Sequence, residues 1–213
     1  MKKVGCIVAS VMFIFFSLFF VSCKKENNKD LTFAEISVFL TEEDKSFREF
    51  SGVIVAKNST HTDIELLKST TEFLEDSISS LALQMDEYQN TMNAASITNQ
   101  DEISFTKTNS LIEIKTDSQA LEANMNEDRT RLKLSFLSDE DFYILEIVQL
   151  DNCYISQMIY KGDGENYTIY TFKFKGSSGE IAISYATNYS SIFEKEELNY
   201  ENYNCTGEIV FKS

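Results

Sequence analysis

In Arg131-Leu132-Lys133-Leu134-Ser135-Phe136-Leu137, polar and apolar side chains alternate from Arg131 to Phe136. Because successive side chains of a strand point to opposite faces of a sheet, this alternation predicts a strand with one face toward water and one toward a core. The next segment, Phe142–Leu150, is apolar on both faces, with Ile144 on one and Leu145 on the other. We expect it at the centre of the sheet, where its second face is covered by a helix or lines a cavity.

The same two-residue period extends to both sides of these segments. Further strands are predicted at Leu111–Lys115, Gln119–Met125, Cys153–Lys161, Tyr167–Lys175, Glu180–Ala186 and Glu208–Lys212. Their connections are short, and short connections join antiparallel neighbours because a parallel crossover needs roughly a dozen residues or more. The sequence therefore predicts an antiparallel β-meander of six to eight strands.

A long amphipathic helix is predicted before the sheet. Thr62 and Glu65 have the spacing of a capping box. Residues that then recur in alternating steps of three and four are Ile64, Leu67, Thr71, Leu74, Ile78, Leu81, Met85, Tyr88, Met92 and Ala95. The flanking positions, such as Ser77 and Gln84, lack the complementary charges that set coiled-coil pairing. We expect this helix to pack on the protein's own sheet in an α+β fold, with dimerisation as the alternative.

The segment from Leu31 to Phe50 fits a strand and a helix about equally well. Within it, Thr41-Glu42-Glu43-Asp44 has the residues of a capped helix start, which would lead to Phe50. Gly52 is expected to end that helix, and Val53-Ile54-Val55-Ala56 has the composition of a short apolar strand. Residues 31–213 together are expected to form a single α+β domain.

The N-terminus has the organisation of a secretory signal: Lys2 and Lys3 precede an apolar run from Val4 to Val21. The block Phe20-Val21-Ser22-Cys23 resembles the lipobox of bacterial type II signal peptides. This resemblance implies that residues 1–22 are removed, that lipid is attached to Cys23, and that residues 23–30 are a polar tether. Lys24, in place of Asp, implies an outer-membrane location in the cell envelope. A plain transmembrane helix is the alternative.

The charge of the chain excludes one class of partner. Without Lys2 and Lys3 it carries 17 basic and 34 acidic residues. Because nucleic acids are bound mainly through Lys and Arg contacts to phosphates, we expect no nucleic-acid partner. The same charge disfavours electrostatic docking on anionic lipid, so the lipid on Cys23 is expected to make the membrane contact.

Residues for catalysis are scarce. His61 is the only histidine, and the sequence has no nucleophile elbow, phosphate-binding glycine loop or zinc spacing. Acidic clusters such as Asp139-Glu140-Asp141 are interpreted as turn and surface acids, ahead of a glycosidase or calcium site. We expect a non-enzymatic protein without cofactor or metal, with an unrecognised hydrolase as a distant alternative.

Two groups of residues are candidate sites. Once Cys6 leaves with the signal and Cys23 is lipidated, Cys153 and Cys205 remain. In an exported protein they are expected to form a disulfide, with two buried free thiols as the alternative. The second group is a set of tyrosines interleaved with asparagines, Tyr185, Tyr189, Tyr200 and Tyr203. They would suit a ligand such as a sugar or a protein partner, although packing on the sheet is the favoured interpretation.

These observations predict a lipid-anchored envelope or surface protein that acts as a non-enzymatic binding or structural module. The alternative is a carrier or chaperone for a lipid or another apolar ligand. It depends on the two-sided apolar strand, Phe142–Leu150, and on a sheet that could curve around a ligand. At the level of the fold, this alternative is similar to lipoprotein carriers and lipocalins, and no motif residue carries the likeness.

Overall fold

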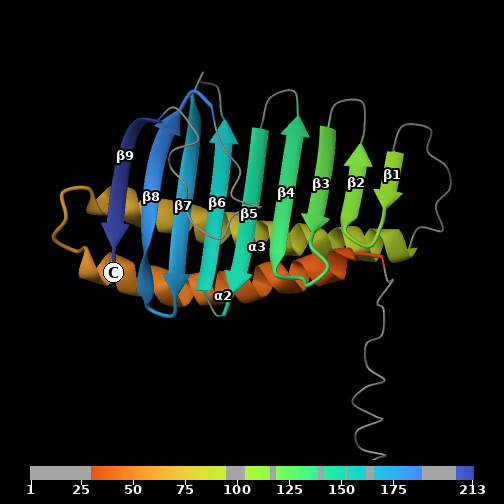
Figure 1. Cartoon of the computed structure of the whole chain (residues 1–213), viewed down its shortest axis with the longest axis horizontal. Helices are drawn as coiled ribbons and strands as arrows, with labels where there is room; N and C mark the ends of the chain where they lie inside the picture. Colours follow the sequence, from red (N-terminus) through yellow and green to blue (C-terminus); the bar gives the residue numbers. More distant parts are fainter. Residues whose placement is uncertain are drawn as a thin grey trace, which may run out of the picture.

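The computed structural model describes residues 30–94, 104–115, 119–138, 142–151, 153–161, 166–188 and 205–213. In these segments two long helices, α2 (Phe33–Lys57) and α3 (Ile64–Ala94), precede a nine-stranded antiparallel sheet (Figure 1). Both helices lie on the same face of the sheet. Neither described helix is long and apolar enough to cross a membrane.

The sheet is a continuous meander in which every strand pairs with its neighbours in sequence. The strands are β1 (Ser104–Lys107), β2 (Leu111–Lys115), β3 (Gln119–Met125), β4 (Arg131–Ser138), β5 (Phe142–Leu150), β6 (Cys153–Lys161), β7 (Tyr167–Lys175), β8 (Ser178–Ala186) and β9 (Cys205–Lys212). The predicted α+β meander is confirmed, with one strand more than the predicted maximum. The additional strand is β1, a short edge strand whose four residues are all exposed.

Helix α2 corrects the expectation for the N-terminal segment. Thr32 and Glu35 form its capping box, in which each side chain accepts a hydrogen bond from the backbone N–H of the other residue. The helix then runs without a break through Gly52 to Lys57. The predicted helix start at Thr41 and the strand at residues 53–56 are therefore wrong. Glycine in a helix costs only about 1 kcal/mol, which the burial of one apolar face outweighs.

The main core lies between the helices and the sheet. Phe47 of α2 lies 4.8 Å from Phe172 between ring centroids, and Phe50 stacks on Phe174 at 5.0 Å. All four side chains are at most 1% exposed. Burial of each Phe stabilises the fold by roughly 1.5–3 kcal/mol. Buried residues of α3 join the same cluster, so α2 and α3 form one layer against the sheet.

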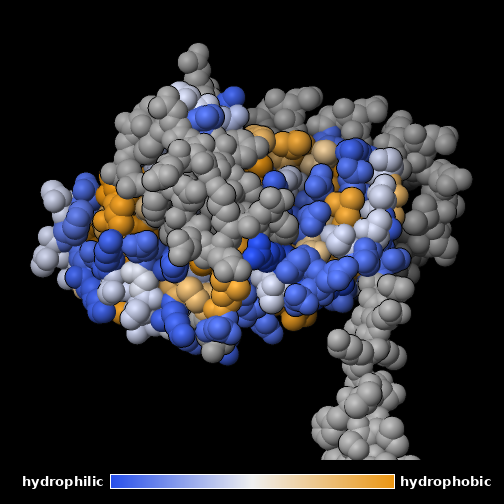
Figure 2. Space-filling model, viewed as in Figure 1, coloured by the Kyte–Doolittle hydropathy of each residue, from blue (hydrophilic) through white to orange (hydrophobic). Residues whose placement is uncertain are grey.

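Strand β5 is the fifth of nine strands, which confirms its predicted central place. Its Leu145 and Ile147 belong to the core beneath the helices. On the opposite face Ile144 and Val148 each join a separate small apolar cluster and are at most 4% exposed. No described helix covers this second face (Figure 1). In the space-filling view from this side, the described residues show hydrophobic patches separated by hydrophilic ones (Figure 2).

Candidate functional site

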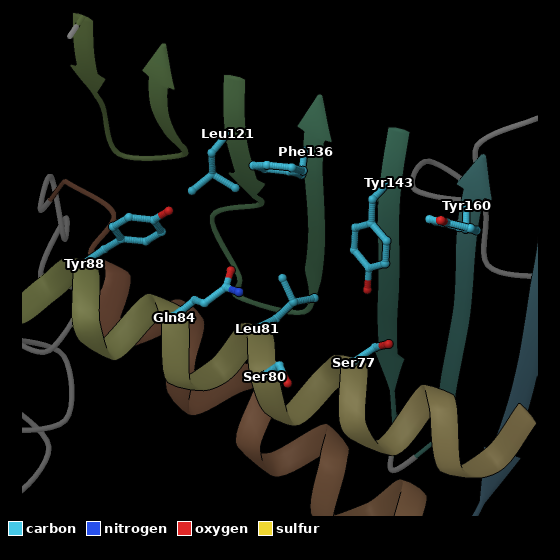
Figure 3. Close-up of a pocket in the computed structure, with 9 residues that line it drawn as sticks. All are labelled: Ser77, Ser80, Leu81, Gln84, Tyr88, Leu121, Phe136, Tyr143 and Tyr160. Carbon is cyan, nitrogen blue, oxygen red and sulfur yellow. The ribbon is translucent and has the colours of Figure 1, made fainter. Parts of the chain in front are cut away.

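A groove of about 350 Å³ opens between α3 and strands β3 to β6 (Figure 3). Its described lining consists of Ser77, Ser80, Leu81, Gln84 and Tyr88 from α3, and Leu121, Phe136, Tyr143 and Tyr160 from the sheet. None of these nine residues is charged, although 25% of the chain is charged. The volume is within the range of small-molecule sites, which is roughly 300–1,000 Å³.

The sheet side of the groove is a single cross-strand row. Leu121 pairs with Phe136, Phe136 with Tyr143, and Tyr143 with Tyr160. Directly opposed residues of antiparallel strands have their Cβ atoms about 4.5–5.5 Å apart on one face of the sheet. The register of four strands therefore sets one aliphatic and three aromatic side chains next to one another.

The row continues beyond the groove at both ends. Tyr160 pairs with Thr168, and Thr168 pairs with Tyr185 of β8, which is 41% exposed. At the other end Leu121 pairs with Ile114, whose partner on β1 is Phe105. The structure thus places Tyr185, a predicted ligand-binding residue, in the same row as the groove. Tyr189, Tyr200 and Tyr203 lie outside the described residues.

The helix side of the groove follows from the spacing of its residues along α3. Ser77, Leu81, Gln84 and Tyr88 are separated by steps of four, three and four, which place them on one face of a helix. The sequence predicts Leu81 and Tyr88 as part of a packing seam, yet Tyr88 is 36% exposed. Ser77 and Gln84, which are uncharged and lie next to that seam, are the sequence feature that could have indicated a binding site.

Between α2 and the sheet lies a buried acid that the sequence assigned to a helix start. Glu43 is 0% exposed, and its Oε1 accepts a hydrogen bond of 2.6 Å from Ser156 Oγ on β6. Its Oε2 has no hydrogen-bond partner among the described residues. Burial raises the pKa of Glu43 to about 8, against the opposing hydrogen bond from Ser156 and with a small contribution from Asp44. Glu43 is therefore mainly a neutral carboxylic acid at pH 7.

Tyr143 connects this buried region with the groove. Its ring lines the groove, and its hydroxyl points toward Ser77 of α3 (Figure 3). That hydroxyl is buried and has no hydrogen-bond partner among the described residues. Burial, and to a smaller extent Glu43, raise the pKa of Tyr143, so the hydroxyl stays protonated. A buried hydroxyl without a partner costs about 1–3 kcal/mol, and few such groups persist in folded proteins.

A second hollow, of about 430 Å³, lies at the N-terminal half of α2 and differs in character. Glu35, Glu42 and Arg129 are among its lining residues. Arg129 Nη1 donates a hydrogen bond to the backbone oxygen of Asn109, and its Nη2 lies 3.8 Å from Glu35. The guanidinium is thus already engaged by neighbouring groups, and the described lining of this hollow offers no free cation to a ligand.

Histidine, cysteine and acidic side chains, which could support catalysis or bind a metal, do not gather into one site in the described segments. His61 packs edge-on against Phe211 at 5.0 Å and lies 3.8 Å from Asp63. No group of three His, Cys, Asp or Glu side chains in the described segments could hold a metal ion. The cluster Asp139-Glu140-Asp141 lies outside the described residues.

The two cysteines predicted to pair are far apart. Cys153 is a free thiol and pairs across strands with Lys175, which pairs with Ser178 at the start of β8. Cys205 pairs with Ala186 at the other end of β8. At about 3.3 Å per residue, the length of β8 alone separates them by roughly 26 Å. A disulfide needs Cα atoms within about 7 Å, and the described backbone register does not bring the two cysteines that close.

Comparison with known proteins finds no relative of this chain. No family model matches it, and neither does any curated protein or solved structure. Cys23 and residues 1–22, which carry the resemblance to a lipoprotein signal, lie outside the described residues. The groove, the charge of the chain and the sequence of its N-terminus are therefore the features that bear on function.

Proposed function

We propose that this protein is a lipid-anchored, non-enzymatic protein of the bacterial cell envelope that binds an elongated apolar ligand in the groove between α3 and the sheet. The observation that carries the proposal is the groove lining, nine described residues without a charge in a chain with 34 acidic residues. Charged side chains favour the hydration of a protein surface. Their absence from a concave surface therefore favours an apolar ligand.

The exposed aromatic side chains in the groove supply the driving force for binding. Tyr88 and Tyr160, on opposite sides of the groove, are 36% and 37% exposed. Covering apolar surface yields about 25 cal/mol per Å² removed from water. The hydroxyls of Ser77 and Ser80 add a few polar contacts that can orient a ligand, as in most small-molecule sites.

The proposed anchor would hold the groove close to a membrane. Residues 24–30 are seven residues, which span at most about 25 Å when extended. They lead to Leu31, whose N–H donates a hydrogen bond to the Thr108 carbonyl, and to Phe33. The Phe33 ring lies 5.5 Å from that of Tyr88 at the end of the groove. An anchor at Cys23 therefore puts this end of the groove within reach of lipids.

A binding module for a protein partner is the second candidate, and a different observation favours it. β1 is at one edge of the sheet, and Ser104–Lys107 are all exposed. Edge strands can accept a strand from a partner through their backbone groups. Binding at β1 would leave the groove free, so the two candidates differ in whether blocking the groove abolishes binding.

The test is a blocking substitution with a matched control on the same helix. Leu81 lines the groove, whereas Leu83 is 63% exposed and is not among the described lining residues. The proposal expects the chain from Lys24 onward to bind an apolar fluorescent dye and to carry lipid-sized mass in native mass spectrometry. Leu81→Trp should abolish both signals and Leu83→Trp should keep them. Equal binding by the two variants, or no binding by the unaltered protein, would contradict it.

A further inference from the structure

We infer that the lipid bound in the groove carries an uncharged hydrogen-bonding head group, an alcohol, glyceride or amide, and that this head group binds the Tyr143 hydroxyl. This inference rests on the proposed function and specifies its ligand. The alkyl chain of the ligand would lie over Leu121 and Phe136, toward Tyr88. The head would be at the opposite end, between Tyr143 and Ser77 (Figure 3).

The first argument is the unused hydrogen-bonding capacity at this end of the groove. The Tyr143 hydroxyl is buried, points toward α3, and has no partner among the described residues. Glu43, which contributes to the electrostatic environment of Tyr143, has a second buried oxygen without a described partner, Oε2. A phenol can donate and accept one hydrogen bond each, which matches a hydroxyl, ester or amide.

The second argument concerns charge. None of the nine described lining residues is Lys or Arg, so a carboxylate or phosphate head would be buried without a counter-ion. The exposed acids Asp76 and Glu87 adjoin Ser77 and Tyr88 of the groove lining on α3, which further disfavours an anion. A cationic head would need a carboxylate within the groove, and the described lining contains none. An uncharged head is the remaining class.

The third argument concerns the source of the ligand. Phe33 is the third residue after Asp30, the last residue of the polar tether, and its ring centroid lies within 6.5 Å of those of both Tyr88 and Phe105. The end of the groove that receives the alkyl chain is thus the end nearest to the proposed anchor. A ligand that enters here head first would reach Tyr143 with its head group and leave its alkyl chain toward Tyr88, the end nearest to the bilayer.

The test uses probes that share one alkyl chain and differ in their head group: dodecanol, dodecanoate and dodecyltrimethylammonium, with dodecane as the headless reference. They compete with an apolar fluorescent dye on the chain from Lys24 onward, which contains every described residue. The matched variants are Tyr143→Phe and Tyr160→Phe, the same change on neighbouring strands that both line the groove.

Dodecanol is expected to bind the unaltered protein more tightly than the two ionic probes, whose charges would be buried without a counter-ion. Tyr143→Phe should weaken dodecanol binding roughly tenfold, which is the value of one buried hydrogen bond, and leave dodecane binding unchanged. Tyr160→Phe should leave dodecanol binding unchanged. The melting temperature of Tyr143→Phe should not fall, because the substitution removes a polar atom that has no partner among the described residues. If the melting temperature does fall, the relative affinities of the four probes for the unaltered protein still test the inference.

The remaining outcomes separate this inference from the proposed function. If all probes, dodecane included, bind equally and Tyr143→Phe changes nothing, the groove binds alkyl chains but the head-group inference is wrong. A preference for the anion or for the cation also overturns the inference and leaves the groove as a binding site. If no probe displaces the dye, or the dye does not bind, the inference and the proposed function both fail.

Discussion

Ser156 on β6 donates a hydrogen bond of 2.6 Å to Glu43 on α2, and both side chains are 0% exposed. This contact ties the first helix to the centre of the sheet through an acid whose charged form is disfavoured by burial. Tyr143 lies close enough to be affected by the same carboxyl group, and Asp44 adds a neighbouring negative charge. The protonation of Glu43 is therefore coupled to folding.

The stability of the fold should decrease as the pH rises from about 4.5 to about 8. The pKa of Glu43 is raised from its ordinary value of 4.5 to about 8 in the folded protein. Between these values the folded protein keeps a proton that the unfolded chain has released, so unfolding releases a proton. The loss is about 1.4 kcal/mol per pH unit inside this window and ends above the folded pKa. Urea titrations across the window measure it.

Glu43→Gln isolates this contribution from the other acids of the chain. The amide keeps the shape and an oxygen that can accept the Ser156 hydrogen bond, but it does not titrate in this range. The variant should match the unaltered protein near pH 5 and exceed its stability at pH 8 by a few kcal/mol. An equal pH slope in both proteins would show that Glu43 is not a buried neutral acid.

Two glycine substitutions test the backbone of α2 and the β7–β8 hairpin. Gly52 is within α2, and a Cβ built there meets nothing within 4 Å. Gly52→Ala should stabilise the fold by about 0.5–1 kcal/mol, because alanine favours the helix. A loss of stability in Gly52→Ala would contradict a continuous α2.

A Cβ at Gly179, in the β7–β8 hairpin, would instead clash with the Lys173 carbonyl oxygen. Gly179→Ala should therefore destabilise the fold by about 1–3 kcal/mol.

Both cysteines should remain as thiols in the chain from Lys24 onward. After export to an oxidising compartment and denaturation without reductant, an alkylating reagent should modify Cys153 and Cys205. Mass spectrometry counts the modifications. A chain that resists alkylation until it is reduced would contradict the register that places Cys153 opposite Lys175 and Cys205 opposite Ala186.

The anchor is tested by Cys23→Ala in the full-length chain. Metabolic labelling with palmitate should label the unaltered protein and not the variant, because the diacylglycerol is expected on this thiol. The variant should also leave the membrane fraction, since the chain would then lack the lipid. Unchanged labelling, or membrane attachment without the label, would contradict a lipid anchor at Cys23.

Much of the sheet could be predicted from the sequence, because each strand combines a two-residue period with turn residues at its ends. The bounds predicted for β2, β3, β5, β6 and β7 are those observed. β1 was missed because its four residues are exposed and carry no burial pattern. The helix through Gly52 differs from the prediction because Thr41 and Gly52 carry the local signals of a helix start and end, whereas the long-range packing of Phe47 and Phe50 stabilises one continuous helix.

The candidate site could not be predicted in the same way. The groove depends on a register that sets Phe136, Tyr143 and Tyr160 side by side, and no single segment encodes that register. The burial of Glu43 likewise depends on the position of Ser156 in the chain, which is 113 residues away. The pairing of Cys153 and Cys205 is limited in the same way, since the distance between two cysteines along the chain does not reveal which ends of the strands they occupy.

The most direct test of the central claim is to locate a bound alkyl chain on the protein. A long-chain alcohol with a diazirine in its chain is bound to the protein produced from the full-length chain, photolysed, and mapped by peptide mass spectrometry. The account predicts adducts in residues 77–88 of α3 and around Tyr143, and their loss in Leu81→Trp but not in Leu83→Trp. Adducts confined to other segments, or the same pattern in both variants, would contradict it.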